Sequence, residues 1–237
     1  MRTLTPSQII DLWERGTPLH PIDRALALVS FVRPEAEWEE LVELSIGERD
    51  RVLLEFRKNL FGRTIEGNSL CPDCGERVEF HLDIDELIGI QPNESDCVLP
   101  LDDGHEVEFR LPNSRDLATI LSTTNIPDAR LQLAERCLSV NGNQQIELTE
   151  ERIADLARVM EERDPLADIQ LDLLCPECQG TWSTTFDILI WLWQELTGEA
   201  TGLLREVHLL ASSYGWDEES ILSMSSQRRQ TYIEMIY

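Results

Sequence analysis

Two related stretches of sequence decide the fold: CPDCGERVEFHLDI at residues 71–84 and CPECQGTWSTTFDI at residues 175–188. In both, a C-P-acidic-C motif precedes a segment in which apolar residues alternate with polar ones, and both end in Asp-Ile. A shift of 104 residues aligns Val78 with Trp182. Such alternation is typical of a half-buried β-strand. The chain therefore contains an internal repeat of a cysteine knuckle followed by a strand.

The two knuckles are candidates for one shared metal site. Each has the C-x-x-C spacing that lets two sulfurs of a tight turn reach the same ion, and two such turns supply four thiolates. The sequence therefore predicts a structural zinc ion in a split four-cysteine, zinc-ribbon-like site with the ligands Cys71, Cys74, Cys175 and Cys178. A zinc ion with four thiolate ligands has no open position for a reacting water. We therefore expect the ion to organise a small β module rather than to catalyse a reaction.

Three other interpretations of these thiols are a redox pair, disulfides and inert side chains. A cytosolic redox dithiol is expected as a single motif beside a βαβ unit, whereas here two motifs each contain a proline and precede a strand. A reducing compartment disfavours disulfides. Cys97 and Cys137 have no partner at ligand spacing. We expect both in the core, because free cysteines are among the most buried residues.

The rest of the sequence is mainly helical in its patterning. Capping boxes formed by Thr5 with Gln8 and by Ser45 with Glu48 predict two helix starts. We expect an α+β fold, with a mainly helical body and a small β module organised by the split four-cysteine site. The expected parts of this one integrated fold are an N-terminal helical region (1–64), a zinc-knuckle β module (65–190) with a hairpin and helices inserted in it (96–165), and a C-terminal helical region (191–237).

The sequence also predicts a strand, a hairpin and a set of C-terminal helices. The alternation at residues 76–84 predicts a strand that includes Ile84. Residues 96–111 predict a hairpin that turns at residues 102–104, with the sequence Asp-Asp-Gly. The short amphipathic C-terminal helices, which carry the basic pair Arg228 and Arg229, are expected either to cap the core or to form a docking hairpin for a partner.

The charge of the chain excludes some classes of partner. Its 237 residues include 20 Lys and Arg against 45 Asp and Glu, a formal net charge of −25. This argues against a nucleic-acid binder and against docking on an anionic membrane, because both need concentrated cations. The longest apolar run, residues 188–193, is too short to span a bilayer, and residues 1–6 have no signal-like apolar stretch. We therefore expect a cytoplasmic protein.

No catalytic set is present in the sequence. The four histidines are scattered, and there is no G-x-S-x-G, P-loop, dinucleotide fingerprint or H-E-x-x-H motif. We therefore expect neither an enzyme nor a small-molecule ligand. Trp182, Trp191 and Trp193 lie beside the second knuckle, and we expect them to be core or interface aromatics.

Several phrases of the sequence together resemble one protein family. They are D-P-L-A-x-I-x-L-x-L-x-C-P-x-C (164–178), F-D-I with a following L-W (186–193), L-L-R-E-V-H (203–208), Y-G-W (214–216), R-R-Q-x-Y (228–232) and L-P-N-S-R-D-L (111–117). The chain resembles the baseplate hub assembly chaperone family of T-even-type tailed phages, which has relatives in contractile injection systems. The resemblance covers roughly residues 65–237.

The resemblance implies a non-enzymatic role in building the baseplate or hub of a contractile, phage-tail-like machine. The implied partners are baseplate or spike and hub proteins, and the four knuckle cysteines are the implied zinc ligands. The resemblance fits both a cytoplasmic assembly factor and one that is incorporated into a phage-tail-like particle.

The two alternative functions are a thiol–disulfide redox protein and a zinc-ribbon adaptor associated with nucleic acid. A thiol–disulfide redox protein would need an exposed knuckle cysteine with a lowered pKa. A zinc-ribbon adaptor associated with nucleic acid would need a basic stripe, and the net charge opposes it. The cations near enough to form such a stripe are Arg49, Arg51, Arg57, Lys58 and Arg63.

Overall fold

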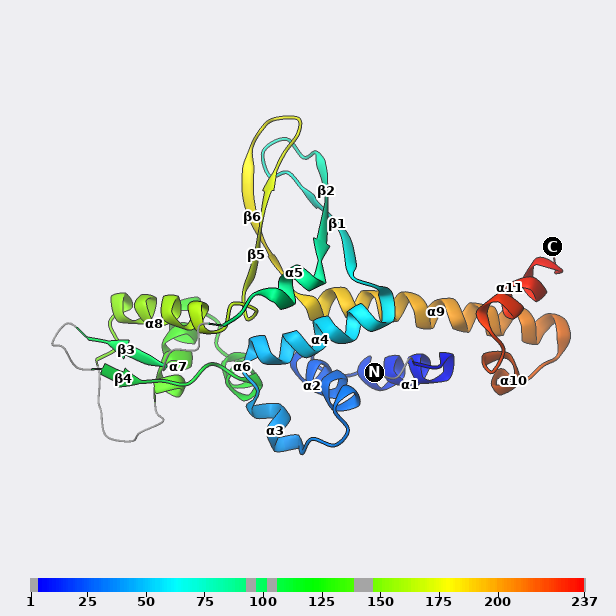
Figure 1. Ribbon diagram of the computed structural model, residues 1–237, viewed down its shortest axis with the longest axis horizontal. Coiled ribbons are helices and arrows are strands. Elements are labelled where there is room, and N and C mark those ends of the chain that lie inside the picture. Colours follow the sequence, from blue (N-terminus) through cyan, green and yellow to red (C-terminus); the bar gives the residue numbers. More distant parts are fainter. Residues whose placement is uncertain (1–3, 93–96, 102–105, 139–146, 237) are drawn as a thin grey trace.

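The computed structural model describes residues 4–92, 97–101, 106–138 and 147–236. The molecule is elongated, and helix α9 (Ile188–Tyr214) runs along its long axis (Figure 1). Two β-hairpins project from one side of the body. The inserted segment lies at one end of the long axis and the C-terminal helices lie at the other (Figure 1).

The N-terminal part is a group of helices packed beside α9. They are α1 (Pro6–Gly16), α2 (Pro21–Val32), α3 (Trp38–Glu43) and α4 (Ile46–Phe61). The capping boxes at Thr5 and Ser45 are both formed, which confirms the two predicted helix starts. In each box the side-chain oxygen accepts from the third helical N–H, which has no partner inside its own helix.

Each cysteine knuckle joins two antiparallel strands. Strand β1 (Thr64–Leu70) pairs with β2 (Arg77–Asp83), and β5 (Ile169–Leu174) pairs with β6 (Thr181–Phe186). The predicted strands after the knuckles are present, and the structure adds a strand before each knuckle. The two hairpins are separate two-stranded sheets, so no backbone ladder joins them.

The Asp-Ile pair that ends each repeat starts a helix. The predicted strand through Ile84 is wrong at its last residue, because Ile84 is the first residue of α5 (Ile84–Gly89). The side chain of Asp83 accepts a hydrogen bond from a backbone N–H of the first turn of α5, and Asp187 does the same for α9. An aspartate at this position satisfies N–H groups that would otherwise lack partners, and it ends the strand.

Trp191 of α9 connects the bases of the two hairpins to the body. Its ring lies 6.1 Å from that of Phe80 on β2 and 6.2 Å from that of Phe186 on β6. A Cβ atom on Gly67 of β1 would lie 2.7 Å from the Trp191 ring, so glycine is needed for this approach. Trp191 is partly buried and packs against the main core, in agreement with one of the two roles expected of the three tryptophans.

The segment between the two hairpins has a small core of its own. It contains β3 (Val98–Pro100), β4 (Glu106–Glu108), α6 (Ser114–Ile120), α7 (Ile126–Leu138) and α8 (Glu150–Arg163). Strands β3 and β4 pair as the predicted hairpin, and its predicted turn at residues 102–104 lies outside the described residues. The buried residues of this core are Leu99, Phe109, Ala134, Leu156 and Val159.

The main core lies between the N-terminal helices, α9 and the bases of the hairpins. Its most buried members include Leu28, Leu53, Ile65, Ile188 and Leu192. Helices α10 (Glu218–Leu222) and α11 (Ser226–Glu234) pack on the far part of α9. Across the described residues, no helix is long and apolar enough to cross a membrane.

Candidate metal centre

The two knuckles have the same backbone turn. In the first, the Cys71 N–H donates to the carbonyl of Glu76 at 2.8 Å and the Gly75 N–H donates to the carbonyl of Cys71 at 2.9 Å. In the second, Cys175 donates to Gly180 at 2.9 Å and Gln179 donates to Cys175 at 3.0 Å. The sequence repeat is therefore also a repeat of local geometry, and each turn presents two sulfurs on the same side.

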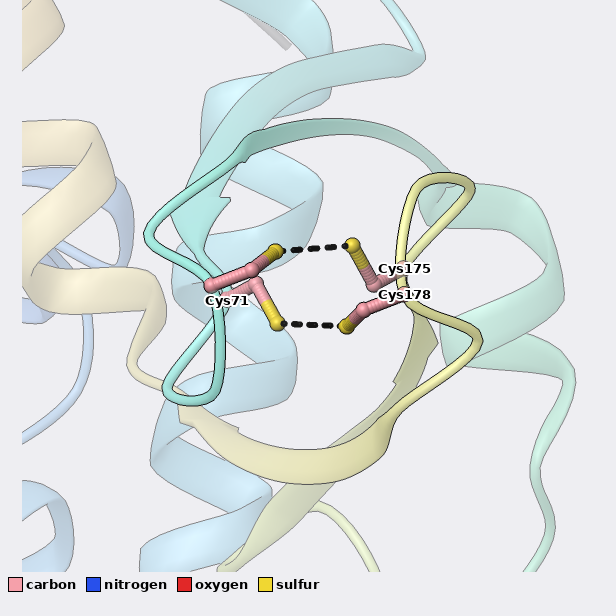
Figure 2. A group of neighbouring side chains, drawn as sticks. Cys71, Cys175 and Cys178 are labelled. Atoms are coloured by element: carbon pink, nitrogen blue, oxygen red, sulfur yellow. Dashed lines mark hydrogen bonds between the residues drawn. The ribbon is translucent and has the colours of Figure 1, made fainter.

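The four predicted ligands come together although about a hundred residues separate the knuckles. The four sulfur atoms lie within 4.8 Å of one another, and all four cysteines are free thiols. The Sγ atoms of Cys71 and Cys178 are 3.6 Å apart, as are those of Cys74 and Cys175 (Figure 2). Sulfurs about 2.3 Å from one tetrahedral zinc ion are about 3.8 Å apart, so these thiols are already close to that arrangement.

Each knuckle contributes one buried and one exposed cysteine. Cys71 and Cys175 are buried, whereas Cys74 and Cys178 are exposed. The two buried cysteines pack with Val78 and Trp182, which are the aligned residues of the two repeats. This small apolar cluster is separate from the main core. A bound metal ion would therefore supply much of the stability with which the two hairpin tips are held together.

The charge state of the sulfurs depends on their neighbours. Hydrogen bonds from the backbone N–H groups of Cys74 and Asp73 lower the pKa of Cys71 to about 7. The backbone N–H of Glu76 lowers the pKa of Cys74, but partial desolvation and the neighbouring thiols outweigh it and raise the value to about 12. Like charges this close disfavour each other, so all four thiols ionise together only beside a cation.

The donor set fits a soft, tetrahedral ion. Four thiolates favour zinc, and the absence of carboxylate oxygens among the four ligands disfavours magnesium and calcium. A bound zinc would have all four positions filled by Cys71, Cys74, Cys175 and Cys178. A zinc ion bound in this way would hold two segments of the chain together, and it would have no free position for a substrate.

The other two cysteines lie outside this site. Cys137 is fully buried on α7, as predicted, and desolvation raises the pKa of its thiol to about 12. Cys97 is half-buried and packs against the core of the inserted segment.

The basic residues considered for a nucleic-acid stripe are engaged within the fold. Arg57 is buried and its guanidinium contacts both carboxylate oxygens of Glu195. Arg51 donates to the backbone carbonyls of Ile88 and Ile90. The others pair with neighbouring carboxylates, namely Arg49 with Asp50, Lys58 with Asp85 and Arg63 with Asp83.

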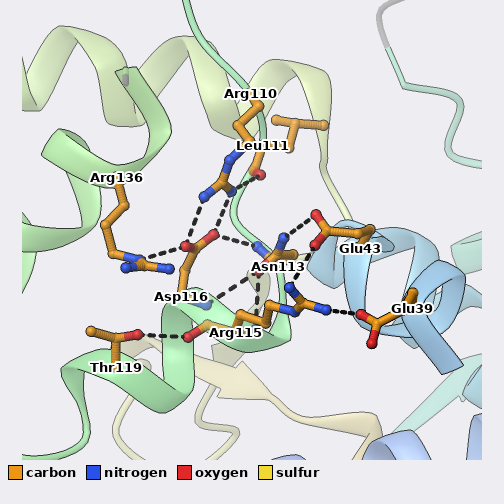
Figure 3. Close-up of polar contacts among 9 residues, drawn as sticks. All are labelled: Glu39, Glu43, Arg110, Leu111, Asn113, Arg115, Asp116, Thr119 and Arg136. Carbon is orange, nitrogen blue, oxygen red and sulfur yellow. Dashed lines mark hydrogen bonds and ion pairs between the residues drawn. The ribbon is translucent and has the colours of Figure 1, made fainter. Parts of the chain in front are cut away.

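The structure shows a buried polar network that the sequence analysis missed. Asp116 is fully buried at the start of α6 and contacts the guanidinium groups of Arg110 and Arg136 (Figure 3). Burial alone would raise the pKa of Asp116, but hydrogen bonds from Arg110, the Asn113 backbone and Arg136 outweigh it and lower the value to about 2. The Asn113-x-x-Asp116 capping box was a signal for part of this network.

The same network connects the inserted segment to the body. The Asn113 side chain donates to Glu43 of α3 at 2.9 Å (Figure 3). Arg115 pairs with Glu43 and Glu39 of α3. These contacts across the junction are polar, whereas the segments on either side each have an apolar core.

Comparison with known proteins identifies the family. A family model described as T4 bacteriophage base plate protein matches residues 31–189, about two thirds of the chain, and this span contains both knuckles and the inserted segment. No curated protein and no solved structure matches the chain. Because the match covers well over half of the sequence, the chain belongs to the T4 bacteriophage base plate protein family.

Proposed function

We propose that the chain is a non-enzymatic assembly factor for the baseplate hub of a contractile, phage-tail-like machine, and that a structural zinc ion joins its two hairpins. The family match supports a role in the baseplate. The more specific chaperone role is supported by the phrases that resemble hub assembly chaperones, several of which lie beyond residue 189.

One observation carries the metal part of the proposal. Four thiols from two distant turns gather within 4.8 Å, at the tips of two hairpins that share no backbone ladder. Without an ion, the link between the tips is a small cluster of four partly or fully buried side chains. Zinc would replace this weak link by four metal–sulfur bonds and keep both hairpins in one orientation for a partner.

The metal is tested on the purified full chain. We expect about one zinc ion per chain by elemental analysis. Cys74→Ser and Cys178→Ser should each lose the metal and lower the free energy of unfolding by several kcal/mol, since metal binding contributes directly to folding. Both side chains are exposed, so a serine there leaves the apolar packing intact.

Cys137→Ala is the matched control for these variants. It removes the thiol of a buried cysteine on α7, outside the four-cysteine site, so zinc should be retained at a cost of roughly 1 kcal/mol for a small cavity. Zinc-free wild-type protein, or serine variants as stable as the wild type, would refute the zinc site.

The assembly role is tested in cells that produce the particle. We expect deletion of the gene to yield tubes and sheaths without complete baseplates, and expression from a plasmid to restore them. Mass spectrometry of purified particles then distinguishes two forms of the role: a chaperone is absent from them, and a structural component is present. Normal particles in the deletion strain would refute the proposal.

A further inference from the structure

An apolar groove lies on the body away from the cysteine site. It has a volume of about 320 Å³, which is at the lower end of the range for binding pockets. Its apolar lining comes from α1, α2, α3 and α9, and includes Leu12, Leu28, Phe31, Trp38 and Trp193. The groove therefore lies where the N-terminal helices meet α9.

Two aromatic side chains at this groove are exposed. Trp38 is 50 % exposed and Phe31 is 39 % exposed. Large aromatic side chains gain about 2–3 kcal/mol from burial, so two of them left open at one groove indicate a surface that another molecule covers. Tryptophan is also among the residues that contribute most to binding at protein interfaces.

Both charged residues that line the groove are arginines, in a chain where acidic residues outnumber basic ones by more than two to one. Arg24 stacks over the Trp193 ring at 4.2 Å and donates to the backbone carbonyls of Gly16 and Leu19. Carbonyl oxygens carry no net charge, so these contacts give the Arg24 guanidinium no counter-charge. Arg15 is exposed in the last turn of α1 and has no carboxylate partner among the described residues.

The groove also lies outside most of the region that the family model matches. Of the residues that line it, all except Phe31 and Trp38 fall outside residues 31–189. Glycine is required at its floor, because a Cβ atom on Gly16 would lie 2.6 Å from an atom of the Trp193 ring. The groove therefore combines two aromatics of the shared family region with segments that lie outside it.

We propose that this groove docks an amphipathic helix of a partner protein, whose apolar side chains fill the groove and whose carboxylates pair with Arg15 and Arg24. The apolar lining can bury apolar side chains that project from one face of a helix, as in other helix-in-groove interfaces. The two unneutralised guanidinium groups select acidic residues beside those anchors and reject lysine or arginine. This docking surface goes beyond the assembly role, which does not say where a partner binds.

The test uses synthetic helices and the full chain with its metal. One peptide of about 15 residues carries leucine or phenylalanine at i, i+3, i+4 and i+7 with glutamate at most other positions. A second peptide replaces each glutamate by lysine, and a third shuffles the first so that its apolar face is lost. Calorimetric titrations are made at about 0.15 M salt, which screens long-range repulsion by the acidic surface.

We expect the acidic amphipathic peptide to bind at least tenfold more tightly than either of the other two. Arg15→Glu and Trp38→Ala should each weaken its binding at least tenfold. Both residues are exposed, so the fold should be retained, which circular dichroism checks. Ile126→Ala is the matched control, because Ile126 is a 75 % exposed apolar residue of α7, and should leave binding unchanged.

Two results would overturn the proposal. Equal binding of the acidic and lysine peptides, or full affinity in Arg15→Glu, would show that the arginines do not select the ligand. Sedimentation of the free chain is the second readout. A dimer that Trp38→Ala dissociates would show that a second copy of the chain covers the groove instead.

Discussion

At the residue scale, Gln179 and Gly75 take the same position in the two knuckles but differ in side chain. Their φ angles are 61° and 77°, and Gln179 is the one residue other than glycine with a positive φ among the described parts of the chain. A residue with a Cβ pays about 1–2 kcal/mol for this conformation, whereas glycine does not. The second knuckle is therefore the more strained of the two.

Placing the residue of one knuckle at the matching position of the other should change the free energy of unfolding in opposite directions. Gln179→Gly should raise the free energy of unfolding by up to about 1 kcal/mol, and Gly75→Gln should lower it by a similar amount. No atom of the described residues lies within 4 Å of a Cβ placed on Gly75, so the loss there is conformational rather than steric. Denaturant unfolding of the metal-loaded protein measures both changes. The same sign for both substitutions would contradict this explanation.

Asp116 gives a prediction about pH. Its pKa is about 2 in the folded chain, whereas an ordinary aspartate has a pKa of 3.8. The ionised form of Asp116 therefore stabilises the fold above about pH 4. This contribution, about 2 kcal/mol, is lost as the pH falls from 4 to 2. Asp116→Asn should therefore be much less stable than the wild type at pH 7, and the difference should shrink towards pH 2.

Comparing the two proteins at each pH cancels the titration of the other carboxylates. Asp155→Asn is the control, because Asp155 is exposed and forms a surface pair with Arg158, and it should change stability by less than about 1 kcal/mol at any pH. A constant difference between wild type and Asp116→Asn from pH 7 to pH 2 would show that the carboxylate charge is not what stabilises this junction.

At the element scale, two helical glycines make contrasting contacts. Gly47 lies in the first turn of α4, where its N–H donates at 2.9 Å to Asp164, 117 residues further along the chain. A Cβ on Gly47 would overlap Oδ1 of Asp164 and lie 3.1 Å from the Ala167 backbone nitrogen. Gly198 lies in α9, and a Cβ there would meet nothing within 4 Å.

Alanine should therefore have opposite effects at these two glycines. We expect Gly47→Ala to destabilise the chain by about 2 kcal/mol or more, because it displaces the buried Asp164 carboxylate from its hydrogen bond. Gly198→Ala should stabilise α9 by up to about 1 kcal/mol, the usual gain from alanine in a helix interior. Thermal unfolding of both variants measures this, and stabilisation by Gly47→Ala would contradict the contact with Asp164.

The sequence predicted those elements whose signals are local. The capping boxes located α1 and α4, and the repeat located β2, β6 and the knuckles, because each depends on residues only a few positions apart. Strand β1 was missed because its sequence, TIEGNSL, has a glycine and few apolar residues, and it is held by pairing with β2 and by Trp191. Its strand character comes from tertiary packing, which overrides propensity.

The candidate site was predictable in its residues but not in its surroundings. C-x-x-C spacing selects four cysteines without reference to the fold. The Asp116 network and the apolar groove depend on side chains from three or more elements, and a single sequence does not show which helices meet. Arg228 and Arg229 illustrate the same point, since α9 buries Arg229 against Glu206 and leaves Arg228 exposed.

At the scale of the whole molecule, the net charge of −25 opposes folding by mutual repulsion. The Debye length falls from about 30 Å at 0.01 M salt to about 8 Å at 0.15 M. We therefore expect the midpoint of thermal unfolding to rise by several degrees, on the order of 5 °C, over this range of sodium chloride. Zinc is kept saturating so that the occupancy of the cysteine site does not change.

Differential scanning calorimetry measures this rise, and a sucrose series of equal osmolality separates charge screening from solute exclusion. Surface ion pairs such as Arg158 with Glu162 respond in the opposite direction, because salt weakens them. A midpoint that falls with salt would show that such pairs outweigh the repulsion between the excess carboxylates.

The distance between the two knuckles along the chain has a consequence for synthesis on the ribosome. At about 5–20 residues per second, the segment of about a hundred residues between them takes roughly 5–20 s to make. During this time only two of the four knuckle thiols, those of Cys71 and Cys74, have been made. The four-cysteine site can form only after Cys178 has left the exit tunnel, and by then the whole inserted segment has been translated. Closure of the cysteine site therefore marks the moment at which every strand of the projecting hairpins has been made.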